Sequence, residues 1–78
     1  MQEYLLMPNY PGFEEVTVAK WHKEPGASFA KFEPLVVVET EKVAMEIQAP
    51  KEGRIVQVIA SKGTRVRSGQ PIALISEN

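Results

Sequence analysis

The sequence predicts an all-β domain built from many short strands. Its β-branched and apolar residues occur in short runs that glycine and proline interrupt, a pattern typical of strands joined by turns. No segment has apolar residues at the helical spacing of about 3.6 over three turns. The segments that we expect to form strands are residues 16–21, 35–38, 43–47, 54–59 and 71–75.

The two halves of the chain resemble each other, which is the second observation that favours this fold class. An offset of 37 residues aligns Gly26 with Gly63, Pro34 with Pro71, and the segment 35–38 with 72–75. Near the N-terminus the offset is 42, because residues 5–8 resemble residues 47–50. The first half therefore carries five extra residues, which fall within residues 9–15.

Two related β halves of this size cannot each bury an apolar face alone. Packing one half on the other about a pseudo-two-fold axis buries both faces. The segment that joins the halves then has the two chain termini as its symmetry counterpart. We therefore expect this joining segment and the termini to lie at opposite ends of the domain.

The joining segment carries Lys42. Four consecutive polar residues separate the expected strands 35–38 and 43–47, which predicts a tight hairpin tip. A lysine at such a tip holds its amine in water, where a modifying enzyme or a partner can reach it. A plain solvated turn explains the same pattern, because charged residues normally lie on the surface.

Length and composition predict one small domain and exclude several functions. The 78 residues fit a single unit over residues 1–78, which we expect to have been excised from a longer multidomain protein. The formal net charge of -1 disfavours a nucleic-acid partner. The apolar runs are too short to span a membrane. The chain has no cysteine, and its single histidine, His22, has no metal-ligand partner, so we expect no metal site.

The residues around Lys42 resemble the lipoyl domain of 2-oxo acid dehydrogenase complexes. The family motif is Glu-Thr-Asp-Lys-Ala, followed by Met-Glu-x-x-Ala-Pro and a glycine. This chain has Glu-Thr-Glu-Lys-Val over residues 39–43, Met-Glu-Ile-Gln-Ala-Pro over residues 45–50, and then Gly53. The turns at residues 23–26 and 62–66 also resemble family turns, so the resemblance covers nearly the whole chain.

This resemblance implies a fold and a function. The fold would be a flattened β-barrel or sandwich of two four-stranded antiparallel sheets with pseudo-two-fold symmetry. Lys42 would carry lipoic acid through an amide bond and act as a swinging arm for acyl groups and reducing equivalents. The domain itself would be non-catalytic, and its parent protein would be a dihydrolipoyllysine acyltransferase. We find no set of nucleophile, base and orienting residue.

The resemblance also implies partners and a location. A lipoate ligase or lipoyl transferase would modify the lysine. The 2-oxo acid decarboxylase, the acyltransferase core and the dihydrolipoyl dehydrogenase would then use the arm, while the isolated domain would be monomeric. Such complexes are cytoplasmic in bacteria and archaea or lie in the mitochondrial matrix.

Two groups of residues are candidates for recognition. We expect the modifying enzyme to read the neighbours of the lysine, although a solvated, locally neutralised turn also explains them. In the family, the loop over residues 9–15 helps the decarboxylase recognise its own domain. An ordinary Pro-Gly turn with aromatic side chains folded onto the core explains that loop equally well. The candidates are Glu39, Thr40, Glu41 and Val43 for the modifying enzyme and Tyr10, Phe13, Glu14 and Glu15 for the partner.

Several positions depart from the family pattern. Phe32 stands where the family usually has a glycine, and it could affect docking of the lipoylating enzyme or simply cover apolar surface. Val43 replaces the usual alanine beside the lysine. Biotin carrier domains share the fold and are an alternative, but their motif has methionine on both sides of the lysine, where this chain has Glu41 and Val43. An unmodified adaptor module is a third hypothesis.

Overall fold

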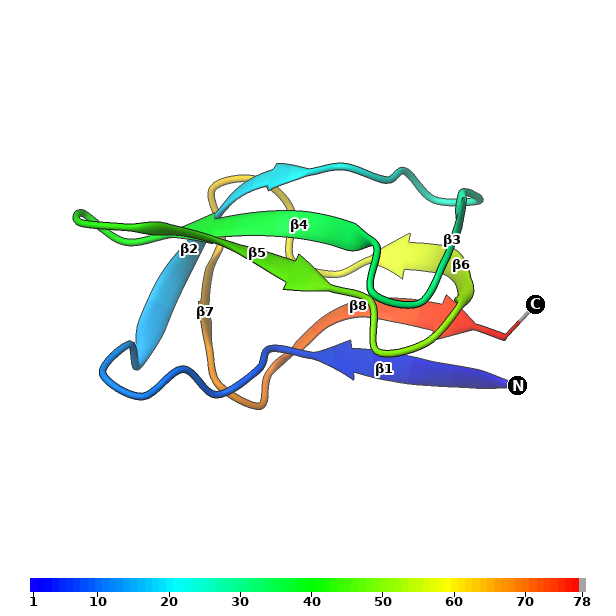
Figure 1. Cartoon of the computed structure of the whole chain (residues 1–78), viewed down its shortest axis with the longest axis horizontal. Helices are drawn as coiled ribbons and strands as arrows, with labels where there is room; N and C mark the ends of the chain where they lie inside the picture. The colour runs from blue at the N-terminus through cyan, green and yellow to red at the C-terminus, as the bar shows by residue number, and fades with distance from the viewer. Residues whose placement is uncertain (78) are drawn as a thin grey trace.

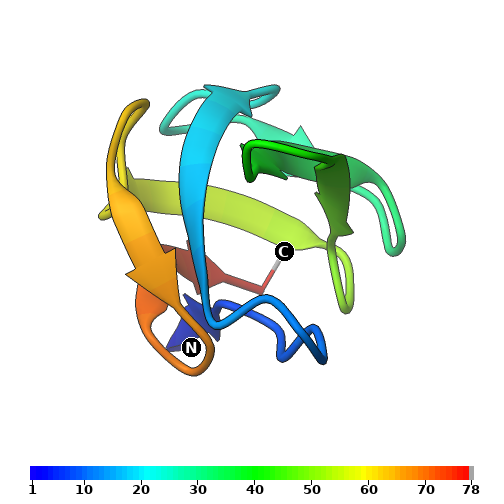
Figure 2. The same ribbon diagram turned by 90° about the vertical axis from the view of Figure 1, so that its left-hand side faces the viewer.

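Eight β-strands make up the computed structural model of the protein, which describes residues 1–77 (Figures 1 and 2). They form two four-stranded antiparallel sheets, as the sequence predicts. The described residues contain no helix, and hence none that could cross a membrane. The strands are β1 (Gln2–Leu6), β2 (Glu15–Trp21), β3 (Ser28–Phe29), β4 (Pro34–Glu39), β5 (Ala44–Gln48), β6 (Gly53–Val58), β7 (Arg65–Arg67) and β8 (Pro71–Ser76).

The strand order of the two sheets confirms the predicted internal repeat. One sheet has the order β1-β8-β6-β3 and the other has the order β5-β4-β2-β7. Replacing each strand by its counterpart in the other half converts the first order into the second. Each sheet therefore contains two strands from each half, and neither half could form its sheet alone.

The repeat extends to strand register and backbone hydrogen bonds. Tyr4 pairs with Leu74 in the first sheet, and the equivalent residues Glu46 and Val37 pair in the second. The first turn of each half has a glycine with a positive φ, 92° at Gly26 and 91° at its equivalent in the second half. Because these turns need a left-handed residue, glycine is the least strained choice at both positions.

The core lies between the sheets and is wholly apolar among the described residues. It consists mostly of inward side chains of the strands, with a few residues that directly follow strands, and no polar side chain is buried with them. The indole N–H of Trp21 donates to the Ala60 carbonyl at 2.7 Å and so satisfies the one polar atom of this half-buried side chain. The core residues are Leu5, Met7, Val16, Val18, Phe29, Leu35, Val36, Val38, Ile47, Ala49, Ile55, Ala60, Val66, Ile72, Ala73 and Ile75.

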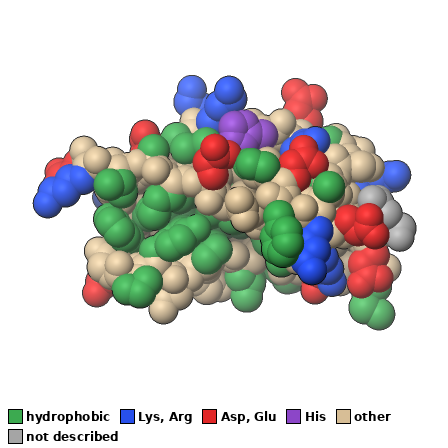
Figure 3. Space-filling view, in the orientation of Figure 1, with side chains coloured by type: hydrophobic (Ala, Val, Ile, Leu, Met, Phe, Trp, Pro, Cys, Tyr) green, Lys and Arg blue, Asp and Glu red, His purple; other side chains and the backbone are tan. Residues whose placement is uncertain are grey.

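The molecule is elongated, with principal extents of 35, 19 and 18 Å. The β4–β5 hairpin lies at one end of the long axis and the termini lie toward the other, as the repeat predicts (Figure 1). Between the edge strands β1 and β5, an apolar groove of about 220 Å³ opens on the face seen in Figure 3.

Strand boundaries differ from the sequence prediction in small ways. Val43 belongs to the turn and β5 begins at Ala44, because the turn closes through the Val43 carbonyl. Ile59 lies just beyond β6, which ends at Val58. The strands β1, β3 and β7 were not predicted. Only one residue of β1 is buried, and the two or three residues of β3 and β7 are too few to show an alternating pattern.

Candidate functional site

Lys42 lies at the tip of the β4–β5 hairpin, between Glu39 at the end of one strand and Ala44 at the start of the next. Its side chain is exposed, and no carboxylate among residues 1–77 forms an ion pair with it. The amine is therefore accessible to another protein, while the two paired strands hold its backbone in place.

Thr40 shapes this hairpin tip. Its N–H donates to the Val43 carbonyl at 2.9 Å, and its hydroxyl oxygen accepts the N–H groups of Lys42 and Val43, both at 3.2 Å. Threonine commonly organises turns in this way, because its side chain bonds to the backbone a few residues ahead. A structural role for Thr40 therefore accompanies the recognition role that the sequence predicts.

The other predicted recognition residues of the hairpin surround the lysine at the surface. Glu39, Glu41 and Val43 are all exposed, and Val43 leaves 41% of its surface in water. Two carboxylates and an aliphatic side chain beside one amine form a small distinctive surface. This surface is suited to recognition by a modifying enzyme.

The loop over residues 9–15 folds through a tight turn. The Phe13 N–H donates to the Tyr10 carbonyl at 2.9 Å, and Gly12 has a φ of 87°. Proline at the second position and left-handed glycine at the third are typical of a type II turn. Tyr10 and Phe13 are half-buried and pack against the core. The aromatic side chains are therefore partly folded onto the core, as the simpler interpretation expects, with the remainder exposed.

This loop lies directly beside the lysine hairpin. A shallow depression of about 260 Å³ is lined by Gly12, Phe13, Glu14 and Glu15 from the loop and by residues 40–42 from the hairpin. Part of each predicted recognition group therefore lines the same depression. Gly12 was not predicted to belong to this surface, although the Pro-Gly pair marks the turn that brings the loop there.

Glu14 and Glu15 differ in whether they form ion pairs. Glu15 begins β2 and forms ion pairs with Arg65 at 3.7 Å and Arg67 at 3.6 Å, both on β7. Glu14 is exposed and has no ion pair with any described residue. Glu14 is therefore the acidic residue of the loop that remains available for a partner.

Phe32 lies away from this surface. It sits in the turn before β4, so the length of that strand separates it from Lys42. The residue is 61% exposed, so contact with the core does not account for it. The Lys31 ammonium lies 5.0 Å from the ring centroid, within cation–π range. Its backbone φ is 69°, and no other non-glycine residue described in the structure has a positive φ.

The accessible reactive group of the site is the primary amine of Lys42. The described residues contain no group of three His, Cys, Asp or Glu side chains that could hold a metal ion. An exposed primary amine on a rigid hairpin can form an amide with an activated carboxylic acid.

A flattened sandwich of two related β halves with an exposed lysine on the connecting hairpin defines a class of small carrier-type domains. The family model described as a biotin-requiring enzyme, Biotin_lipoyl, matches residues 4–75, and the chain belongs to this biotin/lipoyl attachment family.

Curated relatives are similar to almost all of this chain. The dihydrolipoyllysine-residue succinyltransferase component of the 2-oxoglutarate dehydrogenase complex from Escherichia coli K12 is 38% identical over 74 residues, 94% of this chain and 18% of that protein. The protein with the same description from Rickettsia conorii is 41% identical over 78 residues, 99% of this chain and 20% of that protein. The chain therefore spans about a fifth of the length of these relatives.

Solved structures give the same fold. The lipoyl domain of the 2-oxoglutarate dehydrogenase complex from Azotobacter vinelandii superimposes with a TM-score of 0.76 at 34% identity, covering 96% of both chains. A single-chain, multi-domain long-chain acyl-CoA carboxylase matches with a TM-score of 0.83 at 25% identity, over 99% of this chain and 7% of that chain.

Proposed function

We propose that the chain is a lipoyl carrier domain whose Lys42, once lipoylated, passes acyl groups and reducing equivalents between the active sites of a 2-oxo acid dehydrogenase complex. The observation that carries this proposal is the position of Lys42 at the exposed tip of a rigid hairpin, at the far end from the termini. Linkers to further domains would leave from the opposite end, so the arm would be free to enter active sites.

The attached group supplies the chemistry in this proposal. A lipoyl amide removes the lysine charge and adds a long flexible chain ending in a dithiolane. Tethering keeps its local concentration high at each active site, so transfer does not depend on free diffusion. The domain is non-catalytic by itself, and its parent protein is a dihydrolipoyllysine acyltransferase. The chain is one carrier domain over residues 1–78, cut from that longer protein.

Biotin is the second candidate, because the family also contains biotin-dependent enzymes and a carboxylase is among the structural matches. The hairpin favours lipoate. Glu41 and Val43 flank Lys42, where biotin carriers have methionine on both sides. The relatives named for a lipoyl residue are also more similar in sequence, at 38–41% identity against 25% for the carboxylase.

Recognition by partner enzymes follows from the surface around the lysine. A lipoate ligase or lipoyl transferase reads Glu39, Glu41 and Val43, held in place by Thr40. The 2-oxo acid decarboxylase reads the adjoining loop, where Glu14 and the exposed parts of Tyr10 and Phe13 face the surroundings.

The acyltransferase core and the dihydrolipoyl dehydrogenase complete the set of partners. The domain is monomeric when isolated. The complex works in the cytoplasm of a bacterium or archaeon or in the mitochondrial matrix.

The test is enzymatic modification followed by mass spectrometry. The domain is incubated with lipoate ligase, ATP and lipoate, and in parallel with biotin ligase, ATP and biotin. We expect a single lipoyl adduct on Lys42 and little biotinylation. The variant Lys42→Arg should accept nothing, while Lys62→Arg, which alters another exposed lysine, should behave like the native domain. Absence of lipoylation under conditions that modify a known lipoyl domain would refute the proposal, and preferential biotinylation would replace it with the second candidate.

A further inference from the structure

The outer faces of the two sheets have equivalent backbone positions but carry side chains of different polarity. The 37- and 42-residue offsets of the repeat assign each outward residue of one half a counterpart in the other. Gln57 is exposed on the outer side of β6, where it pairs with Leu74, and its counterpart in the other half is Lys20. Around it, five outward residues of β1, β8, β6 and the turn just after β6 form what we call the apolar face: Tyr4, Leu6, Val56, Ile59 and Leu74. In the other sheet, their counterparts form the polar face: Glu46, Gln48, Ala19, His22 and Val37.

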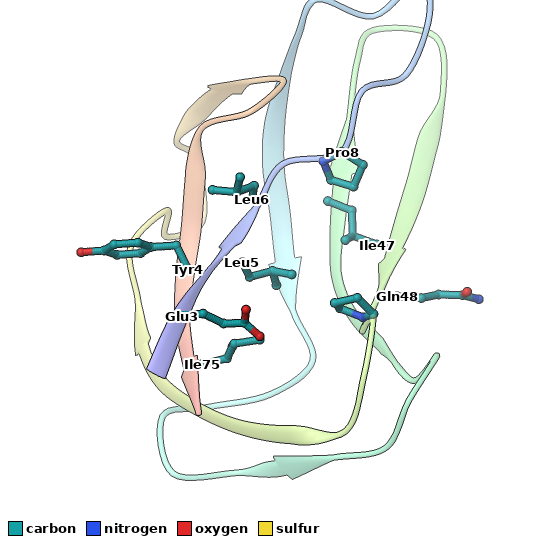
Figure 4. A pocket seen from close by; sticks show the side chains of 9 residues that line it. Glu3, Tyr4, Leu5, Leu6, Pro8, Ile47, Gln48 and Ile75 are labelled. Carbon is teal, nitrogen blue, oxygen red and sulfur yellow. The ribbon is translucent and has the colours of Figure 1, made fainter. Parts of the chain in front are cut away.

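The apolar face is well exposed. Tyr4 leaves 59% of its surface in water, Leu6 50%, Ile59 43% and Val56 36%. Figure 4 shows Tyr4 and Leu6 directed to the side of β1 opposite to Leu5, which points into the core. These side chains therefore do little to bury the interior of the domain.

One pair of positions shows the contrast most clearly. On the polar face, the His22 ring lies 3.2 Å from the Glu46 carboxylate. The equivalent positions on the apolar face hold Ile59 and Tyr4, so a polar pair is replaced by an aliphatic and an aromatic side chain. Leu6 likewise corresponds to Gln48.

The fold itself does not require the apolar residues. Glutamate, glutamine and histidine occupy the same backbone positions in the other half, so polar side chains are compatible with this geometry. Isolated exposed apolar residues are common, and a contiguous group of them on one face can form an interaction site. The asymmetry between two otherwise equivalent faces therefore points to a partner that contacts only one of them.

Size and charge define the partner. Five side chains expose an apolar area of at most a few hundred Å², well below the roughly 800 Å² per partner of a stable interface. A permanent dimer is therefore disfavoured and a transient contact is favoured. Arg54 lies on the same outer side of β6 and forms no ion pair with any residue in the described part of the chain. A partner surface that is uncharged, with a carboxylate at its edge that forms an ion pair with Arg54, would match this face.

We propose that the apolar face is a second docking surface, used in transient binding to an apolar protein surface with an acidic border on a component enzyme of the complex. The identity of this partner rests on the proposed function. The face lies on β1, β8 and β6, away from the Lys42 hairpin (Figure 1). A domain held by this face would therefore keep its lysine tip free to reach an active site.

The pseudo-symmetry supplies the test variants. Tyr4→Glu and Leu6→Gln install the residues that the other sheet already carries at the same positions. The double variant should therefore fold, which circular dichroism checks. The matched control alters the polar face by Glu46→Ala and Gln48→Ala. Arg54→Glu is an independent variant that reverses the border charge while leaving the apolar residues in place.

The measurement is an NMR titration of ¹⁵N-labelled, unmodified domain. The probes are the purified decarboxylase, acyltransferase core and dihydrolipoyl dehydrogenase of the same organism, added one at a time. We expect at least one enzyme to broaden or shift amide signals of β1, β6 and β8. The Tyr4→Glu, Leu6→Gln double variant and Arg54→Glu should each weaken that binding about tenfold, and the polar-face control should not.

Several results would overturn this inference. They are signal changes confined to residues 9–15 and 39–43 with every enzyme, no change with any enzyme, equal weakening by the control, or signal changes that depend only on domain concentration. The unmodified domain is used so that docking is measured separately from modification of Lys42. Failure of lipoylation would therefore refute the proposed function without deciding the docking result.

Discussion

Phe32 and Gly69 occupy equivalent turns of the two halves, and both have a positive φ, 69° and 83°. The Phe32 N–H donates to the Ala49 carbonyl and the Gly69 N–H to the Met7 carbonyl, both at 2.8 Å, so the turns are also closed in the same way. A left-handed conformation costs a residue with a Cβ atom roughly 1–2 kcal/mol. The first half therefore contains a strained aromatic residue where the second half has an unstrained glycine.

We expect the strain at Phe32 to be measurable by comparing two small substitutions. Phe32→Gly and Phe32→Ala both remove the exposed ring, but only glycine is unstrained at this φ. The glycine variant should therefore be more stable than the alanine variant by about 1 kcal/mol. Urea unfolding followed by Trp21 fluorescence gives both free energies.

The equivalent position provides the control. Gly69→Ala should lower the free energy of unfolding by about 1 kcal/mol, because it introduces the same strain without adding contacts. No atom outside the turn lies within 4 Å of the added Cβ, so a clash does not complicate the comparison. Equal stability of the two Phe32 variants would show that this turn can relax its backbone without cost.

The spacing of glycine and apolar residues in the sequence predicted this fold. The features that it did not predict were missed for physical reasons. The offset that aligned Gly26 with Gly63 also aligns Phe32 with Gly69, but a phenylalanine gives no sign that its φ is positive. The exposed tip carrying Lys42 was predictable because four polar residues separate two apolar runs. The hydrogen bonds of Thr40 were not, because they depend on how the turn closes in three dimensions.

The hydroxyl of Thr40 should be important for the lysine hairpin. Thr40→Val keeps the shape of the side chain and removes the acceptor for the N–H groups of Lys42 and Val43. We expect a loss of about 1 kcal/mol in unfolding free energy, together with faster amide hydrogen exchange at residues 42 and 43. Thr40→Ser retains the hydroxyl and serves as the control. Native exchange rates in Thr40→Val would show that the strands alone hold the tip.

The ion pair of Glu33 should make stability depend on acid pH. Its carboxylate accepts a hydrogen bond from the Lys23 ammonium at 2.6 Å and another from the Ala30 N–H at 2.9 Å, and these hold the pKa of Glu33 below its ordinary value of 4.5. The unfolded chain then binds the proton more readily than the folded one. The stabilisation is present above about pH 4.5 and is lost as pH falls through the lowered pKa of the folded state.

The repeat supplies a matched variant for this titration. Gln70 is the equivalent of Glu33, and its side chain accepts the Arg67 N–H at 2.6 Å. Glu33→Gln should therefore keep the turn hydrogen bond while removing the titrating group. We expect the variant to lose less stability than the native domain between pH 5 and pH 3, measured by urea unfolding at each pH. Parallel pH profiles would exclude Glu33 as a source of the acid sensitivity.

Packing at one pair of core positions differs between the halves and allows a double-mutant test. Phe29 pairs with Gly53 across β3 and β6, while their counterparts Val66 and Val16 pair across β7 and β2. A Cβ added at Gly53 would lie 3.1 Å from the Phe29 ring and 2.5 Å from the Ser76 carbonyl oxygen. The large aromatic side chain therefore occupies space that a glycine leaves free, and two valines divide the equivalent space in the other half.

We expect Gly53→Val and Phe29→Val to compensate each other. The first change alone overpacks the core, at a cost of about 2–3 kcal/mol. The second alone leaves a cavity, at a cost of about 2 kcal/mol. Together they reproduce the valine pair of the other half, so the double variant should be more stable than additivity predicts by at least ~1 kcal/mol. Additive losses in urea unfolding would mean that the Ser76 carbonyl, rather than the Phe29 ring, prevents a larger side chain from fitting at Gly53.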